Sequence, residues 1–392
     1  MTNKNKNKNK AVAASVSASA EGGGWSAVFG CTYEGIALFR IVVGILLTSE
    51  LILRFRFLHV FYTDEGTMPL RLLVPKIDTV YRLVCYHCHF ETLFAQQLLL
   101  SLQVVVAICF TIGYYTKVTS ILSFYMYTSL ILRCTWLYFI LDRYFYYLLF
   151  YAMFLPLSQK WSVDQYLDDT KKKYQRNENH NDATTTTTTS SVSVLFVNPA
   201  TVALKLLVLW IYLDAGVNKY LDPQEGWTYH ADPLPALDTY ARHTIGAQYL
   251  YTLLGPQGLR FLTPLVVYTE IGCVPLASIG AYFQHTKLVN LTIILIVGMH
   301  LGISICIRNS NLLSYIATSV WILFVPLATL RRKQQQKNDN DGRSGNRDTT
   351  TTVNDSTTRT RSSSSRSRST RNRLGSVITY LVVGGMVGGN IW

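Results

Sequence analysis

Long apolar runs, separated by polar segments, dominate the sequence. A helix needs roughly 20 residues to cross a bilayer, and eight runs come close to that length or reach it: 34–53, 93–112, 117–137, 141–157, 201–221, 259–283, 288–306 and 311–330. A chain surrounded by lipid must satisfy its backbone hydrogen bonds internally, so each run is predicted to be helical. The pattern therefore predicts an all-α, polytopic membrane helix bundle of about eight transmembrane spans.

Polar or glycine-rich segments surround and interrupt the predicted transmembrane domain, which covers 34–330. The tail 1–33, the insertion 168–193 and the linker 331–373 are rich in Lys, Ser, Thr, Asn or Arg. They hold too few apolar residues to offset the entropy lost on ordering, so they are predicted to be disordered. The last segment, 374–392, is apolar and rich in glycine, and it is a candidate ninth span.

The charged residues indicate an orientation in the membrane. Only 15% of residues are charged and 49% are hydrophobic, whereas a soluble domain has about 25% charged residues. With eight spans, the basic clusters of the N-terminal tail, of the loop 158–200 and of the linker after residue 330 share one side, which the positive-inside rule places in the cytosol. The net charge of +13 is then explained by basic residues that orient the chain in the membrane. The lipid bilayer is the expected partner, and no nucleic acid is expected.

The same reasoning predicts a location for the chain. No cleavable signal peptide is recognisable near the N-terminus, so the first apolar run is expected to act as an uncleaved signal anchor. This favours a multi-pass protein of the endoplasmic reticulum or another endomembrane, with a cytosolic N-terminus. The loops 54–92 and 222–258 are then expected to face the lumen or the exterior.

Ionisable residues inside the apolar runs are the first candidates for function, because charges in a membrane are costly. They are Arg40, Glu50, Asp142, Arg143, Asp214, Lys219, Glu270 and His300. On the expected topology Lys219, His300 and Asp142 lie in the lumenal leaflet. Lys219 is either a cation anchored at the membrane edge or, if desolvation removes its proton, a general base.

The neighbours of these residues leave alternatives open. Tyr212 and Gly216 share the helix face of Lys219, where small residues make room for a neighbouring helix or for a ligand. Glu270 is expected to pair with Arg40, His300 or a lysine. His300 either carries a proton or hydrogen-bonds a substrate, or it makes an interhelical hydrogen bond. The glycines around it, Gly298 and Gly302, favour helix packing.

The segment Cys85-Tyr-His-Cys88-His89 is the one cluster with the residue types of a metal site. Two thiols and two imidazoles are ligands that zinc accepts. Their spacing is too compressed to close easily on one ion, and no second half is evident. A disulfide or two free thiols is therefore expected, and no metal.

Several motifs, taken in order, resemble the horizontally transferred transmembrane (HTTM) domain family, which is related to vitamin K-dependent γ-carboxylase. The resemblance covers roughly 34–330, and each motif alone has little specificity. The segments that carry it are Leu38-Phe39-Arg40, Phe61 to Pro69, Phe154 to Leu157 with Trp161 to Asp164, Ala215 to Leu221 with Trp227, Glu270, and His300-Leu301-Gly302.

The resemblance implies a membrane enzyme of the carboxylase or oxygenase type that acts on a hydrophobic quinol or lipid. By this likeness Lys219 is the general base, and His300 and Asp142 are supporting catalytic groups. Tyr212, Gly216 and Glu270 are candidate positions for binding a cofactor, either reduced vitamin K or another quinol. The likeness predicts a hydrophobic small molecule as the partner.

Two departures from the carboxylase pattern limit what the resemblance implies. The carboxylase has a histidine before the fourth span, where this chain has Leu141-Asp142-Arg143-Tyr144. Its large lumenal domain, which grips peptide substrates, has no counterpart after residue 330. Quinol or lipid chemistry is therefore expected rather than peptide carboxylation. The alternatives are a non-catalytic membrane carrier or assembly factor, and an interaction protein that works through its tails.

Overall fold

The computed structural model describes residues 24–73, 83–134, 139–178, 195–222, 226–228, 244–307 and 311–325. Contacts within the chain divide it into a unit of residues 1–327 and a unit of residues 328–392. The second unit, with the predicted linker 331–373 and the segment 374–392, lies outside the described residues.

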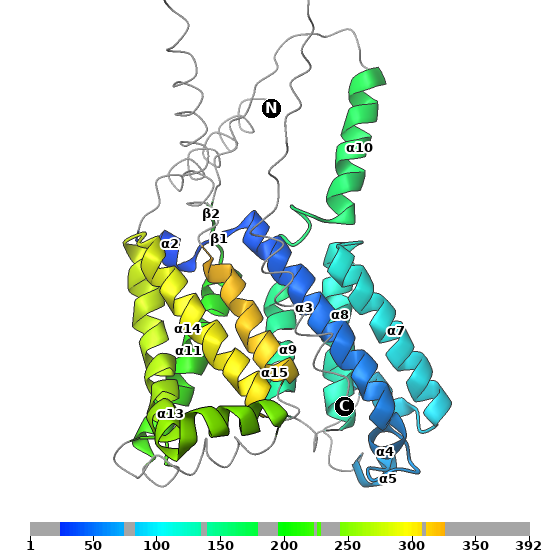
Figure 1. Ribbon diagram of the computed structural model, residues 1–392. Helices are drawn as coiled ribbons and strands as arrows, with labels where there is room; N and C mark the ends of the chain where they lie inside the picture. Colours follow the sequence, from blue (N-terminus) through cyan, green and yellow to red (C-terminus); the bar gives the residue numbers. More distant parts are fainter. Residues whose placement is uncertain are drawn as a thin grey trace, which may run out of the picture. The chain divides into compact units, whose positions relative to one another are not determined.

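The described chain is almost entirely helical (Figure 1). The α-helices are α2 Trp25–Phe29, α3 Tyr33–Arg54, α4 Leu58–Tyr62, α5 Leu70–Leu73, α7 Leu93–Ile112, α8 Thr116–Arg133, α9 Ile140–Ala152, α10 Val163–Glu178, α11 Pro199–Leu221, α13 Ile245–Tyr282, α14 Thr286–Cys306 and α15 Asn311–Ser319. Three 3₁₀ helices join them: η1 Phe55–Phe57, η3 Tyr86–His89 and η6 Val320–Phe324. Two short strands, β1 Cys31–Thr32 and β2 Leu195–Phe196, pair in antiparallel register.

Five helical segments are long and apolar enough to cross a membrane. They are Tyr33–Tyr62, Leu93–Ile112, Pro199–Leu221, Ile245–Tyr282 and Thr286–Cys306. Each overlaps a run that the sequence predicted to be a span. The all-α prediction is confirmed for the described residues, and the chain has the make-up of a multi-pass membrane protein.

The other three predicted spans are also helical, but they do not meet the same length and apolarity. Helix α8 has 18 residues and carries Lys117, Arg133 and several hydroxyl groups. Helix α9 has 13 residues, and Leu312–Phe324 is a short apolar helix. The count of eight spans, or nine, therefore stays a prediction.

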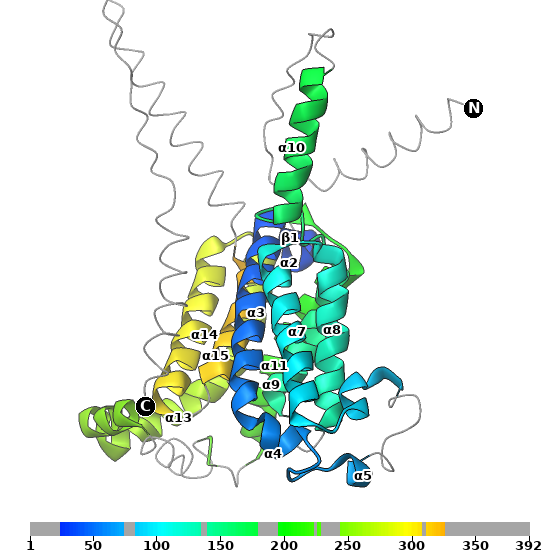
Figure 2. The same cartoon turned by 90° about the vertical axis from the view of Figure 1, so that its right-hand side faces the viewer.

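Helix α3 links two groups of helices within the first unit. It contacts α7 on one side and both α15 and η6 on another, while α13 packs against α11 and α14. Figure 1 shows α7 and α8 on one side of α3 and α11, α13 and α14 on the other, and in Figure 2 α7 and α8 again lie together beside α3. Most of the inward side chains of α3 are large and apolar, including the fully buried Phe39 and Leu46.

Helix α13 contains a sharp break. Gly255 has a φ of 63° and interrupts the helical backbone, a conformation that glycine adopts at little cost. Pro256 follows and starts the second part, since proline suits the first turn of a helix. The first part packs through Ala247 against Cys306 at the end of α14.

Arg40 fixes one end of the bundle. Its side chain is fully buried and donates to the carbonyl oxygens of Leu157 and Trp161, with a longer bond of 3.4 Å to that of Thr111. A charged side chain inside a membrane protein needs partners, and backbone carbonyl oxygens can supply them for an arginine. The segment after α9 is thereby tied to α3 and α7.

Asp164 caps the neighbouring turn. Its carboxylate accepts hydrogen bonds from the backbone N–H groups of Tyr115 and Thr116, both at 2.8 Å, and from the Thr116 hydroxyl at 2.6 Å. Partial burial opposes the charged form, but these bonds and the nearby Arg40 outweigh it and lower the pKa of Asp164. The carboxylate thus holds the start of α8.

Two predictions of disorder are wrong for the residues that the structure describes. Within 1–33, residues 24–33 form α2, β1 and the start of α3, because Lys205 donates to the carbonyls of Val28 and Gly30 and orders them. Within 168–193, residues 168–178 continue α10, whose start is capped by the Ser162 hydroxyl. Its Lys, Asp and Gln side chains are compatible with a solvated helix. Residues 1–23 and 179–193 lie outside the described chain.

Replacing Asp164 by alanine is expected to destabilise the protein by about 1 kcal/mol, the usual cost of losing a helix cap. A lowered pKa means that the carboxylate contributes stability above the unfolded-state pKa of about 3.9 and loses it as the pH falls further. Thermal unfolding in detergent should therefore separate wild type from Asp164→Ala at pH 7, and less so below about pH 4. Asp168→Ala, an exposed site on the same helix, is the control and should match wild type.

Candidate functional site

Lys219 is bound directly to Glu270. The Lys219 Nζ, near the end of α11, donates to both carboxylate oxygens of Glu270 on α13, at 2.6 and 2.7 Å. Glu270 is 6% exposed. The same Nζ lies 5.1 Å from the centre of the Trp227 ring, in cation–π geometry. The structure thus selects a lysine from the three partners that the sequence left open for Glu270.

Gly216 lets the two helices approach closely enough for this pair. A Cβ at Gly216 would stand 2.7 Å from the Ile271 Cγ1 and 3.0 Å from the Glu270 Cβ. Both distances are shorter than ordinary contacts. The space beside Lys219 is therefore filled by α13, and helix packing explains this glycine.

Tyr212 and His300 form a second polar contact, about two helical turns before Lys219 on α11. The Tyr212 hydroxyl lies 2.6 Å from the His300 Nε2 and 3.3 Å from the carbonyl oxygen of Ala317. The Trp321 ring packs edge-on against Tyr212, with 5.4 Å between ring centres. The His300 Nδ1 is buried and has no hydrogen-bond partner in the part of the chain that is described.

The glycines beside His300 do not pack as the sequence suggested. A Cβ at Gly298 or at Gly302 would meet no described atom within 4 Å. The expected helix contact is therefore absent from the described residues. The open positions are those of the two glycines, whereas the His300 side chain itself contacts Tyr212.

These contacts belong to one cluster, called the Lys219 cluster below: Lys219, Glu270, Tyr212, His300 and Tyr144. Lys219 lies within electrostatic range of His300, and Glu270 lies within range of Tyr144 and Tyr212. Tyr144 was not singled out from the sequence. Its only signal there was its place in the Leu141-Asp142-Arg143-Tyr144 motif.

Asp142 belongs to a different cluster, called the Arg54 cluster below: Arg54, Glu50, Asp142, Tyr62 and Tyr127. Arg54 forms ion pairs with Glu50 and Asp142 and donates to the Tyr62 hydroxyl at 2.6 Å. Asp142 also accepts from the Tyr127 hydroxyl and from the Phe139 N–H, both at 2.9 Å. Asp142 thus starts α9 and binds α3, and it makes these bonds instead of contacting Lys219 or His300. The sequence did not select Arg54, because it follows the first apolar run and appeared to be a loop residue.

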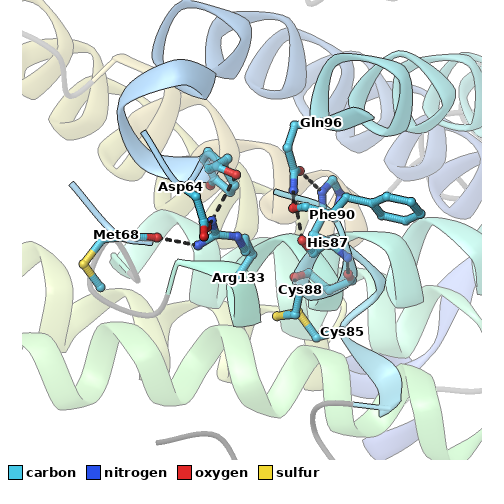
Figure 3. Close-up of a disulfide and its surroundings, with 10 residues drawn as sticks. Asp64, Met68, Cys85, His87, Cys88, Phe90, Gln96 and Arg133 are labelled. Carbon is cyan, nitrogen blue, oxygen red and sulfur yellow. Dashed lines mark hydrogen bonds and ion pairs between the residues drawn. A yellow bond between two sulfur atoms is a disulfide. The ribbon is translucent and has the colours of Figure 1, made fainter. Parts of the chain in front are cut away.

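The predicted disulfide alternative holds for Cys85 and Cys88, which are bonded to each other (Figure 3). Both cysteines are buried, and Leu70 packs with them. Bonded sulfur atoms are not thiolate ligands, and His89 is exposed while His87 is buried. Among the described residues, no group of three or more metal-binding side chains occurs.

His87, between the two cysteines, is held in one tautomer by Gln96. The Gln96 Nε2 donates to the carbonyls of His87 and Phe90, at 2.9 and 2.8 Å. Its Oε1 therefore faces the His87 Nδ1 at 2.6 Å and accepts from it. Figure 3 shows this clamp beside the disulfide and Arg133. Burial lowers the pKa of His87 to about 4, helped by Arg133 and Arg54, so the imidazole is neutral near pH 7.

Comparison of the chain with protein-family models, with curated proteins and with solved structures finds no match. The likeness to HTTM domains therefore stays a prediction from the sequence motifs.

His87 is expected to make the fold sensitive to acid. Its folded pKa of about 4 lies below the unfolded value of about 6.5, so the unfolded state binds the proton first as the pH falls. Stability should be fully present above about pH 6.5 and should decline towards pH 4. Thermal unfolding from pH 8 to pH 4 measures this. His87→Gln should flatten that part of the profile, while the exposed control His89→Gln should keep it; equal profiles for wild type and His87→Gln would contradict it.

Gly216→Ala is expected to lower the thermal midpoint and weaken the Lys219–Glu270 pair, because the added methyl would displace Ile271. Overpacking of this kind costs about 1–3 kcal/mol. Gly298→Ala is the matched control on α14, where nothing lies within 4 Å. It should be neutral or slightly stabilising, since alanine favours helix. Equal effects at the two positions would show that the α11–α13 contact is not close.

Proposed function

We propose that this chain is an integral membrane enzyme of the HTTM type, related to vitamin K-dependent carboxylase, in which Lys219 takes a proton from a hydrophobic quinol or lipid. One observation carries the proposal. A lysine held by a buried carboxylate lies within electrostatic range of a histidine whose Nδ1 is buried and has no partner in the described structure. A buried polar atom left unpaired is costly, and a hydroxyl of a bound substrate would satisfy it.

The Lys219–Glu270 contact gives a route for the proton. A base must be neutral before it reacts, and the ammonium of Lys219 has Glu270 within 2.6 Å to receive its proton. Transfer along this hydrogen bond leaves a neutral amine and a protonated carboxyl group, a state that a low-dielectric site favours over two charges. The amine then accepts the substrate proton, while His300 orients the substrate oxygen.

The residues present fit a hydrophobic ring with an acidic hydroxyl. Trp227 places an aromatic ring next to Lys219, the buried Trp321 packs against Tyr212, and His300 offers the hydrogen bond. A reduced quinone, when bound, supplies the acidic hydroxyl and the electrons for a reaction with oxygen. In this proposal Glu270 is the proton partner of the base, Tyr212 orients His300, and Asp142 keeps α9 in place.

The proposal includes the finer topology. Helices α8 and α9 and the α15–η6 segment complete a bundle of eight spans, with the N-terminal end of α3 on the cytosolic side and the Lys219 cluster towards the lumen. The basic clusters in the sequence support this orientation. The membrane is that of the endoplasmic reticulum or another endomembrane compartment.

A second candidate function is a non-catalytic membrane carrier or assembly factor. It is favoured by the direct bonds from Lys219 to both oxygens of Glu270 and by the filling of the space at Gly216 by α13. In that case the ion pair joins α11 to α13 and does no chemistry.

Lys219→Met separates the two functions. With vitamin K hydroquinone in proteoliposomes, wild type is expected to consume oxygen, and the variant is expected to lose about 10²- to 10⁴-fold of that rate, the usual contribution of a general base. Oxygen uptake and thermal unfolding are measured on the same preparations. Lys287→Met, at an exposed position on α14, is the control and should keep full activity.

Two results would contradict the proposed enzymatic function. Wild type without any quinol-dependent oxygen uptake would remove the quinol reaction. A Lys219→Met variant that keeps its rate but unfolds earlier would make the lysine a structural partner of Glu270. Glu270→Gln adds a further test, since it keeps the shape of the side chain while removing the proton acceptor.

A further inference from the structure

A small cavity lies between three helices, away from the Lys219 cluster. It is lined by Leu47 and Leu51 of α3, Gln103 of α7, and Ser123, Met126 and Tyr127 of α8. The centre of a water-sized sphere can occupy about 10 Å³ of it. This is close to the least space that holds one water molecule, so any guest is the size of a single water or a bare small cation.

Gln103, which lines this cavity, has an unsatisfied carbonyl oxygen. The side chain is 3% exposed. Its Nε2 donates to the Met126 carbonyl and lies 3.5 Å from the Tyr86 hydroxyl, which fixes the orientation of the amide. The Oε1 then has no hydrogen-bond partner among the described residues. A buried acceptor of this kind needs a donor or a cation.

Ser123 presents a second unsatisfied oxygen. Its side chain is 4% exposed, and its Oγ has no partner in the described part of the protein. Hydroxyl groups on the same helices bond back to the carbonyl four residues earlier, as Thr48, Thr111 and Thr128 do. Ser123 is different because it makes no such bond, which leaves its lone pairs for a guest.

The adjoining Arg54 cluster holds two carboxyl groups and one guanidinium, so it has one excess negative charge when both carboxyl groups are ionised. The single charge of Arg54 is shared between two carboxylates, Glu50 and Asp142. The Glu50 Oε2 is buried without a partner in the described residues. Glu50 lies in the turn of α3 between Leu47 and Leu51, and Tyr127 both lines the cavity and donates to Asp142.

Neighbouring positive groups do not remove this charge. Arg133 is 3.7 Å from Asp64 and donates to the carbonyls of Met68 and Tyr62. His87 on η3 donates its Nδ1 hydrogen to Gln96 and is neutral near pH 7. An unpaired charge inside a protein is costly, so the excess charge is removed either by a proton on Glu50 or by a further positive group.

We propose that the cavity binds one sodium-sized monovalent cation, with the Gln103 Oε1 and Ser123 Oγ as ligands and Glu50 supplying the balancing charge. Oxygen atoms are the ligands that hard cations prefer. A water molecule would satisfy the two oxygen atoms but leave the charge. A proton on Glu50 would remove the charge but leave both oxygen atoms unpaired. A single cation meets both needs, whereas otherwise a water molecule and a proton would both be required, and only a cation makes the stability depend on sodium.

Thermal unfolding of the full-length protein in detergent tests the site. NaCl is titrated against choline chloride at constant ionic strength and pH 7.5, since choline is too large for the cavity. Sodium is expected to raise the unfolding midpoint in a saturable way, because a ligand that binds only the folded state stabilises it. Saturable binding of radioactive ²²Na⁺ to wild type is the second measurement.

Variants locate the effect. Gln103→Met and Ser123→Ala each remove one ligand oxygen and should abolish the sodium dependence and the ²²Na⁺ binding, and Glu50→Gln should do so by removing the excess charge. Ser101→Ala is the control, because that hydroxyl is exposed and bonds to the Gln97 carbonyl. Wild type that binds no ²²Na⁺ and unfolds alike in sodium and choline overturns the proposal, and so does sodium binding that survives in both Gln103→Met and Ser123→Ala.

Discussion

Pairing of buried polar groups between helices determines how this bundle is assembled. Apolar side chains give helices in a membrane no preference for one neighbour over another, because lipid is equally apolar. The buried charges do give such a preference. Arg40 ties α3 to the segment after α9, Arg54 ties α3 to α9, and Lys219 ties α11 to α13. Breaking such a pair leaves a charge unpaired, so each fixes a register as well as a neighbour.

The sequence predicted the positions of the helices better than it predicted which helices pack together. The apolar runs located α3, α7, α11, α14 and the second part of α13, because the membrane demands about 20 apolar residues and backbone bonds within the segment. Charge inside apolar runs singled out Lys219 and Glu270, which the structure pairs. Their pairing was out of reach, since residues 51 positions apart meet only through the packing of α11 on α13.

Glycine and arginine show why the rest could not be predicted. Gly216 and Gly298 look alike in the sequence, yet one is pressed against Ile271 and the other faces open space. Which face of a helix meets a neighbour depends on the whole bundle. Arg54 seemed to be an ordinary charge at the end of a span, but the helical segment continues to Tyr62 and encloses it. The segments predicted to be disordered were drawn too long, because Lys205 orders the end of the first and Ser162 caps the helix that enters the second.

The break at Gly255 has a consequence for how α13 packs. The segment 245–254 is fastened to the end of α14 by the Thr244 hydroxyl, which donates to the Ile305 carbonyl at 2.6 Å, and by Ala247 against Cys306. Its own helix continues only through a glycine that offers little resistance to bending. Both parts of α13 nevertheless meet at this place, because Leu259, just after the break, packs with Ala247 and Cys306. The break therefore lets one helix of the sequence fold back on the end of α14, the helix of His300, without losing contact with the part that carries Glu270.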